Sequence, residues 1–179
     1  METKTRAELL KMYDEVDPFS EGLARVRKGD KWFHICPNGT PAYGQKYDQV
    51  GPFSEGLAQA MDNSGCFHIR HDGSPAYEQR FNEIGFFLEG LAKVHQGDKW
   101  FHIRPDGNPA YEQRFDYAGS FSEGLARACD NSGWFHIRFD GVPAYGQRFD
   151  AVIAFTGGLA LVSKDGRSFN IRHNGTKAD

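Results

Sequence analysis

The sequence predicts an all-β fold made of five tandem repeats, each a short three-stranded antiparallel meander. Three observations lead to this prediction. Related sequence returns every 34 residues without insertion or deletion, an Asn-Gly or Asp-Gly pair returns at the same interval, and each of the four full copies is interrupted by Pro and Gly. A short amphipathic helix is expected ahead of the repeats, over residues 5–12.

The period is set by a phenylalanine that is followed in each copy by a Gly-Leu-Ala step. The five phenylalanines are Phe19, Phe53, Phe87, Phe121 and Phe155. The repeats therefore run over 13–46, 47–80, 81–114, 115–148 and a shorter 149–179. We expect them to form a single repeat domain, 13–179, behind an N-terminal cap of residues 1–12.

A period of 34 residues is also that of helical tetratricopeptide repeats, so chemistry must separate the two. Helical repeats need long stretches of 3.6-residue periodicity. Here one proline and several glycines interrupt every full copy, the prolines being Pro41, Pro75, Pro109 and Pro143. These residues would break such helices, which excludes the helical interpretation.

Within the first copy, three strands are expected in order. Ala24–Val26 begins one strand, Trp32–Ile35 alternates as a second, and Ala42-Tyr43 follows a proline as a third. Asn38-Gly39 predicts a hairpin turn in which both residues have positive φ. One such meander can barely bury a core, so neighbouring copies must stack on one another.

The way in which the copies stack is open to two interpretations. The last copy carries Ser168, Asn170 and Lys177 where the fourth has Trp134, His136 and Pro143. Atypical terminal copies are typical of an open array, which must cap its exposed faces. We therefore expect an open, elongated β-solenoid, with a closed five-unit β-propeller-like ring as the alternative.

Composition and charge limit the partners. A net charge of −3 argues against nucleic acid, because nucleic-acid binding depends on neutralised phosphates. No apolar run is long enough to span a membrane, and the first residues lack the apolar core of a signal peptide, so a cytoplasmic location without membrane association is expected. The three cysteines stand at different repeat positions, which predicts no disulfide framework.

Alternation along the second strand suggests a binding face. If the Phe and Ile side chains form the core, the Trp, His and Arg side chains lie together on the other face. Such a surface would stack aromatic groups and bind carboxylate or phosphate through arginine. The alternative, which we favour, is that these side chains fill the seams between copies, since residues that pack a repeat recur in every copy. The candidate binding residues are Trp32, His34, His68, Arg70, Trp100, His102, Arg104, Trp134, His136 and Arg138.

The repeated polar residues predict neither metal binding nor catalysis. A metal needs ligands that converge at about 2 Å, whereas successive histidines of a stack are at least one strand spacing, about 4.8 Å, apart. Catalysis needs one asymmetric constellation, and nearly all polar groups here come in equivalent copies. A row of glutamates, Glu21, Glu55, Glu89 and Glu123, is expected to satisfy backbone donors in a turn or to pair with Arg80, Arg114 and Arg148. No metal, cofactor or catalytic residue is expected.

Several of these motifs resemble the bacterial WG-repeat family. The resemblance rests on Lys31-Trp32, on Tyr47–Val50 and above all on the Phe53–Ala58 run, FSEGLA, and it covers residues 13–179. One departure is that a Phe follows the Trp position where the family has Gly. The resemblance brings no catalytic residues with it, so it implies a non-catalytic scaffold that binds protein or peptide partners.

Two other function classes stay open. Residues 97–107 bear a weaker likeness to choline- and cell-wall-binding hairpin repeats, which hold ligands on aromatic side chains. A glycan- or cell-wall-ligand-binding module is therefore the alternative function, and a hydrolase or transferase is the third class.

Overall fold

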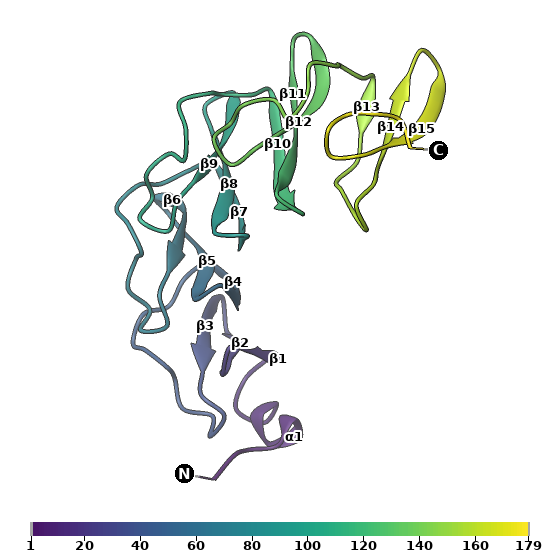
Figure 1. Cartoon of the computed structure of the whole chain (residues 1–179). Coiled ribbons are helices and arrows are strands. Elements are labelled where there is room, and N and C mark those ends of the chain that lie inside the picture. Colours follow the sequence, from purple (N-terminus) through teal and green to yellow (C-terminus); the bar gives the residue numbers. More distant parts are fainter. Residues whose placement is uncertain (1, 179) are drawn as a thin grey trace. The chain divides into compact units, whose positions relative to one another are not determined.

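The computed structural model describes residues 2–178 and confirms an all-β chain (Figure 1). It comprises one short helix and fifteen strands within the described residues. The elements are α1 (Arg6–Leu9), β1 (Glu15–Ser20), β2 (Leu23–Lys28), β3 (Lys31–Ile35), β4 (Gln49–Ser54), β5 (Leu57–Asp62), β6 (Gly65–Ile69), β7 (Glu83–Leu88), β8 (Leu91–Gln96), β9 (Lys99–Ile103), β10 (Tyr117–Ser122), β11 (Leu125–Asp130), β12 (Gly133–Ile137), β13 (Ala151–Val152), β14 (Ala160–Lys164) and β15 (Arg167–Ile171). The chain forms two compact units, Met1–Phe86 and Phe87–Asp179. None of the helices in the described part of the chain is long and apolar enough to cross a membrane.

The strands form five three-stranded antiparallel sheets, each in chain order. In the first sheet, Ala24 pairs with Ile35 and Arg27 pairs with Trp32. The register of the first strand shifts between Val16 and Phe19, which marks a bulge, and the same shift recurs in the sheets that begin with β4 and β10. The repeat in sequence is therefore a repeat in hydrogen bonding.

The number of strands per copy was predicted correctly, but one member was not. The expected third strand at Ala42-Tyr43 is absent: Pro41 and Tyr47 make only isolated bridges to β3. The segment that follows Tyr47 instead forms the first strand of the next sheet, which is β4 in the second copy. A proline, Pro52, and the bulge interrupt its alternation, which conceals it from a period-2 reading.

The turn chemistry also differs from the prediction. Of the Asn38-Gly39 pair, only Gly39 has positive φ, and Asn38 instead accepts the backbone N–H of Thr40 through its side chain. The turn with two positive φ values is Glu21-Gly22, which joins β1 to β2. This pair returns in the next three copies as Glu-Gly.

Side chains on both faces of β3 are buried. Within the first unit, β4 lies against β1, β2 and β3, and within the second unit β10 lies against β8 and β9. Three consecutive residues of β3, Phe33, His34 and Ile35, are buried, although alternate residues point to opposite faces. The binding-face interpretation, with one core face and one open face, therefore fails for β3, because residues on both of its faces are buried.

The N-terminal helix is shorter than the predicted 5–12. Thr5 caps it through a capping box with Glu8, and the helix ends after Leu9, with turn residues in the remainder. Leu9 is buried, so the segment covers the first repeat with one apolar side chain.

Candidate binding surface

The four repeated histidines are structural joints between copies. His34 Nε2 lies 2.9 Å from the carbonyl oxygen of Gly51, and Nδ1 lies 2.6 Å from the hydroxyl of Tyr43. A carbonyl oxygen only accepts, so Nε2 carries the proton and Nδ1 accepts from the tyrosine. The same arrangement holds for His68 with Tyr77 and Gly85, for His102 with Tyr111 and Gly119, and for His136 with Tyr145 and Ile153.

Burial makes these joints neutral. All four histidines have 0% exposure, and a phenylalanine ring from the next copy lies against the imidazole, Phe53 against His34 at 4.6 Å between centroids. Desolvation lowers the pKa of His34, His68 and His102 to about 4, and it also lowers the pKa of His136. His34, His68, His102 and His136 are therefore buried in the seams between copies, as the favoured interpretation expected, and they do not form an open binding surface.

The candidate arginines Arg70, Arg104 and Arg138 are exposed, but they support their own copy. Arg104 donates to the carbonyl oxygens of Pro109 at 2.7 Å and Ala110 at 2.8 Å. Arg70 and Arg138 donate to the equivalent carbonyl oxygens. These contacts fold the segment after the Asp-Gly turn back onto the strand end, and the arginines do not join the tryptophans in one cluster.

The glutamate row fastens each turn to the next. The Glu123 carboxylate accepts the backbone N–H groups of Gly157 at 2.6 Å and Gly158 at 2.9 Å. Glu89 accepts those of Glu123 and Gly124 in the same way. The expectation that these glutamates satisfy backbone donors is confirmed for Glu21, Glu89 and Glu123. The arginines named as their other partners lie instead on phenylalanine rings, at 3.7 to 3.8 Å: Arg80 on Phe67, Arg114 on Phe101 and Arg148 on Phe135.

The tryptophans are the predicted residues that remain half-exposed. In the first unit, the guanidinium of Arg25 lies 4.4 Å from the centroid of Trp32. That guanidinium is also held by Asp17 at 2.5 Å. The first copy therefore carries one tryptophan under a neutralised arginine.

In the second unit, four rings form a row. His95 stacks on Trp100 at 4.8 Å between centroids, Trp100 lies 5.8 Å from Tyr117, and Tyr117 lies 5.3 Å from Trp134. All four side chains are half-buried. They come from four strands of two sheets, β8 and β9 of one and β10 and β12 of the other, and Trp100 and Trp134 stand one repeat apart.

Two cations complete this row. The ammonium of Lys93 lies 5.0 Å from the Trp100 centroid and 5.6 Å from that of Tyr117. The guanidinium of Arg127 lies 5.2 Å from the Tyr117 centroid and donates to the Tyr117 hydroxyl at 3.0 Å. We call this set of six residues the aromatic–cation face: Lys93, His95, Trp100, Tyr117, Arg127 and Trp134.

A glycine permits the position of Arg127. A Cβ on Gly119 would come within 2.8 Å of the Arg127 Cγ, so the arginine stem lies across a residue without a side chain. The first copy has Asp17 at the equivalent position and the second has Gly51. The residue at this repeat position, Asp17 or Gly119, therefore decides whether the cation of the middle strand lies beside a carboxylate.

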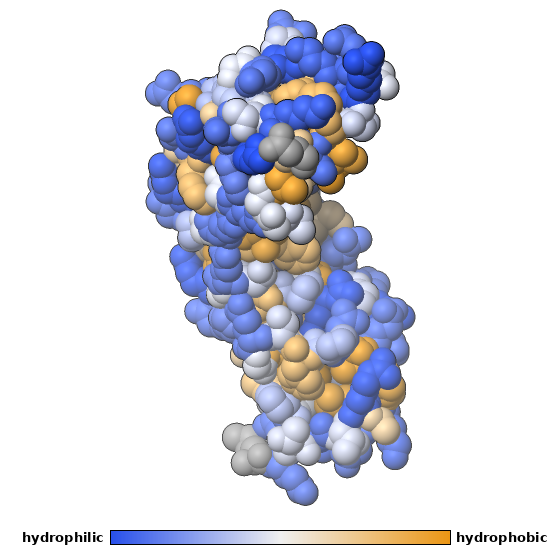
Figure 2. All heavy atoms as spheres, turned by 45° about the vertical axis from the view of Figure 1, so that its right-hand side comes forward, coloured by the Kyte–Doolittle hydropathy of each residue, from blue (hydrophilic) through white to orange (hydrophobic). Residues whose placement is uncertain are grey.

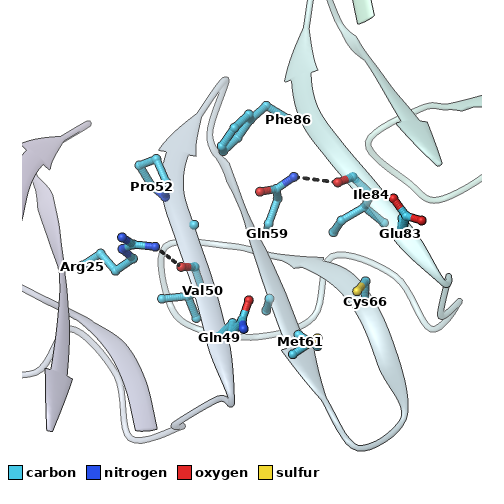
Figure 3. A pocket seen from close by; sticks show the side chains of 12 residues that line it. Arg25, Gln49, Val50, Pro52, Gln59, Met61, Cys66, Glu83, Ile84 and Phe86 are labelled. Carbon is cyan, nitrogen blue, oxygen red and sulfur yellow. Dashed lines mark hydrogen bonds between the residues drawn. The ribbon is translucent and has the colours of Figure 1, made fainter. Parts of the chain in front are cut away.

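In the first unit, the same repeat positions form a hollow of about 330 Å³ (Figure 3). Cys66 stands where the other full copies have tryptophan, and Gln59 and Met61 stand where the third copy has Lys93 and His95. The Gln59 amide donates to the carbonyl oxygen of Ile84 across the hollow at 2.8 Å. The hollow is lined by Arg25, Gln49, Val50, Gly51, Pro52, Gln59, Ala60, Met61, Cys66, Glu83, Ile84 and Phe86.

The remaining surface is mostly polar. Figure 2 shows a largely hydrophilic face on which hydrophobic residues appear in separate patches. Within residues 2–178, no group of three or more His, Cys, Asp or Glu side chains is placed to hold a metal ion. The three cysteines are free thiols.

The repeat itself identifies the family. A family model described as the WG containing repeat matches residues 10–32, 45–66, 69–100 and 103–134. The chain belongs to the WG-repeat family. No match was found among curated protein sequences.

The fold of this WG-repeat chain is also similar to solved structures. Kluyveromyces lactis Hsv2 with loop 6CD replaced by a Gly-Ser linker matches with a TM-score of 0.56 and 13% identity, over 89% of this chain and 63% of that one. Hsv2 of Kluyveromyces marxianus matches with a TM-score of 0.55 and 11% identity, over 90% and 63%. The chain thus spans less than two thirds of these structures. These structures are β-propeller-like, and at such identities the likeness concerns the fold alone.

Sequence reasoning named two members of the aromatic–cation face in this WG-repeat protein, Trp100 and Trp134. It missed Lys93, Tyr117 and Arg127, and it gave His95 no role. Their positions vary between copies: Glu15 and Gln49 stand at the position of Tyr117, and Arg25 and Gln59 stand at the position of Lys93 and Arg127. A search for recurring residues passes over such positions.

Proposed function

We propose that this WG-repeat protein is a non-catalytic scaffold that binds a protein or peptide partner through the aromatic–cation face. The observation that supports the proposal is the row of half-buried Trp100, Tyr117 and Trp134 with two cations beside it. Tryptophan, tyrosine and arginine are the residues that dominate the binding energy of protein interfaces. Here they are gathered at one place.

The spacing of the rings suits an extended chain. Side chains on one face of a strand repeat every two residues, about 6.6 to 6.8 Å. The ring-to-ring steps of 5.8 Å and 5.3 Å are close to that repeat. An extended peptide would therefore place successive side chains of one face against Trp100, Tyr117 and Trp134 in turn.

The nearby thiol supports a role without catalysis. Cys129 pairs with Trp134 across β11 and β12 and is the nucleophile nearest the face in this register. Burial raises the pKa of the Cys129 thiol, and the carboxylates of Asp116 and Asp130 raise it further. A thiol with a raised pKa is protonated at neutral pH and is a poor nucleophile.

Fluorescence provides a direct test. The chain has three tryptophans, and Trp32→Phe leaves only the two on the face as reporters. We expect peptides rich in aromatic residues to change this emission, and Trp134→Phe to reduce the change. A glycan or cell-wall ligand is the second candidate, because half-exposed tryptophans are also platforms for sugars. A response to chito-oligosaccharides or choline, with none to peptides, would replace the first proposal with the second.

We also propose that the five copies form an open stack rather than a closed ring. The glutamate contacts that fasten Glu89 to Gly124 and Glu123 to Gly158 join each copy to the next one only. Such nearest-neighbour contacts survive a change in copy number. Deleting residues 81–114 in phase should therefore leave a folded, monomeric protein by circular dichroism and sedimentation. Collapse or dimerisation on deletion would favour the ring.

A further inference from the structure

We propose that the aromatic–cation face selects acidic peptide segments, with Lys93 and Arg127 holding carboxylates of the partner while the rings pack against its side chains. The inference rests on the proposed function and adds the charge of the partner. It depends on one contrast between copies of the same repeat.

The contrast concerns a cation at one repeat position in the middle strand of three sheets, namely Arg25, Lys93 and Arg127. In the first copy, Arg25 is neutralised by Asp17 at 2.5 Å, and its neighbour Arg27 is neutralised by Glu15 at 2.7 Å. Within residues 2–178, neither Lys93 nor Arg127 forms an ion pair with a carboxylate. Two copies thus present cations without the internal partner that the first copy supplies.

The sequence accounts for this difference locally. At the position of Asp17, the fourth copy has Gly119, and the Arg127 stem lies across it. At the position of Glu15, the fourth copy has Tyr117, whose ring and hydroxyl receive the guanidinium. Two carboxylates are therefore replaced by a glycine and an aromatic ring at the place where the cations gather.

Two carboxylates near the face in sequence, Asp116 and Asp130, have other partners. Asp116 is paired with Lys99 at 2.5 Å, and Asp130 accepts the backbone N–H of Ser132 at 2.8 Å. Arg127 uses one N–H group on Tyr117 and has further N–H groups for a ligand, and Lys93 has three. Both side chains are half-buried, so an ion pair here is less screened than on an open surface.

The net charge of −3 bears on how the aromatic–cation face distinguishes acidic from basic peptides. The protein as a whole repels acidic partners weakly, so binding of an acidic segment must come from a local cationic site. A basic peptide would instead meet two uncompensated cations at the rings. The face therefore discriminates by attraction of one class and repulsion of the other.

The test uses synthetic copolymers as probes. The Trp32→Phe protein is titrated with a random Glu/Tyr copolymer, a random Lys/Tyr copolymer of the same length, and polygalacturonate as an acidic glycan. We expect the Glu/Tyr copolymer to bind, and to bind more weakly as salt is raised from about 50 to 300 mM. Lys93→Gln and Arg127→Gln should each weaken it roughly fivefold, the effect of a modest ion pair.

Controls come from the repeat. Glutamine already stands at this position in the second copy as Gln59, so both variants use a residue that the fold accepts, and thermal melting checks this. Arg25→Gln, which removes a cation that already has a carboxylate, should leave binding unchanged. If one variant unfolds, binding by the other variant and the salt dependence still test the preference for acidic peptides.

The remaining outcomes separate the two proposals. Equal binding of the Glu/Tyr and Lys/Tyr copolymers, or full affinity in both glutamine variants, overturns the acidic preference and leaves the peptide-binding scaffold standing. Binding of polygalacturonate with none of the Glu/Tyr copolymer overturns the peptide assignment in favour of an acidic glycan. Binding of none of the probes counts against both proposals.

Discussion

Lowering the pH from 7 to 5 should destabilise the protein through its buried histidines. His34, His68 and His102 have a folded-state pKa of about 4, against an ordinary value of 6.5. Between these values the unfolded chain binds protons that the folded chain excludes. The stability contributed by neutral burial is therefore complete above pH 6.5 and is lost as the pH falls toward 4.

The structure sets the magnitude. For each histidine, the lowered pKa corresponds to roughly 3 kcal/mol once the pH is below 4 and to about 2 kcal/mol at pH 5. Three such histidines amount to about 6 kcal/mol at pH 5, and His136 adds in the same direction. Domains of this kind are stable by about 5–15 kcal/mol, so acid should remove much of the total.

Urea unfolding followed by circular dichroism at pH 7.5, 6.5, 5.5 and 5.0 measures this loss. The range avoids carboxylates with lowered pKa values, such as Asp62 and Asp106, whose contributions fade at lower pH. The matched variant is His102→Asn, since the last copy carries Asn170 at this position. It should be less stable at pH 7.5 but should show a shallower dependence on pH. An unfolding free energy that stays constant from pH 7.5 to 5 would refute the histidine joints.

Four further substitutions test the packing of the core and the contacts that fasten the turns. Ile103→Ala should lower the free energy of unfolding, measured in urea, by about 2–5 kcal/mol because the side chain is fully buried. Arg104→Ala removes two exposed hydrogen bonds and should lower it by about 1 kcal/mol. The reverse order would show that the core has been placed on the wrong side of the strand. Cys66→Trp should fill the hollow of the second copy and raise the melting temperature by about 2–4 °C for each kcal/mol gained, while a fall would show that the space is not shaped for the ring. Glu123→Ala should cost about 1–3 kcal/mol, through two lost charge-assisted hydrogen bonds and an alanine at positive φ, and hydrogen exchange should rise at the amides of Gly157 and Gly158; unchanged exchange would contradict the fastening role.

The strands were predictable where the pattern is local. Trp32–Ile35 alternates and lies between turns, and β3 covers it. The burial of His34 was not predictable in the same way. It depends on Tyr43, nine residues on, and on the carbonyl oxygen of Gly51, seventeen residues on, and alternation carries no information about either. Period-2 reasoning assumes one solvated face, and stacking removes that face.

The candidate site was predictable only in part for a related reason. Trp100 and Trp134 recur in phase and were found. Tyr117 is an exception to the repeat and Lys93 stands at a position that varies between Arg, Gln and Lys in the full copies, so their relation appears only when β8, β9 and β10 lie against one another. In the sequence, Tyr117 at the position of Glu15 and Gln49 looks like an ordinary variation between copies. In the structure it lies between two tryptophans, Trp100 and Trp134.

Repeated and non-repeated residues therefore do different work in this chain. The repeated ones satisfy one another: His136 is held by Tyr145 and Ile153, and Glu123 holds Gly158, so each has its partners inside the protein. A residue whose hydrogen bonds are complete and buried has little to offer a ligand. Positions that vary between copies escape that constraint, because the joint does not depend on them. The histidine contacts are the same in the copy with Asp17 and in the copy with Gly119. Asp17 neutralises Arg25, however, whereas Gly119 provides no carboxylate for Arg127. Recognition in such an array is thus expected where the copies differ.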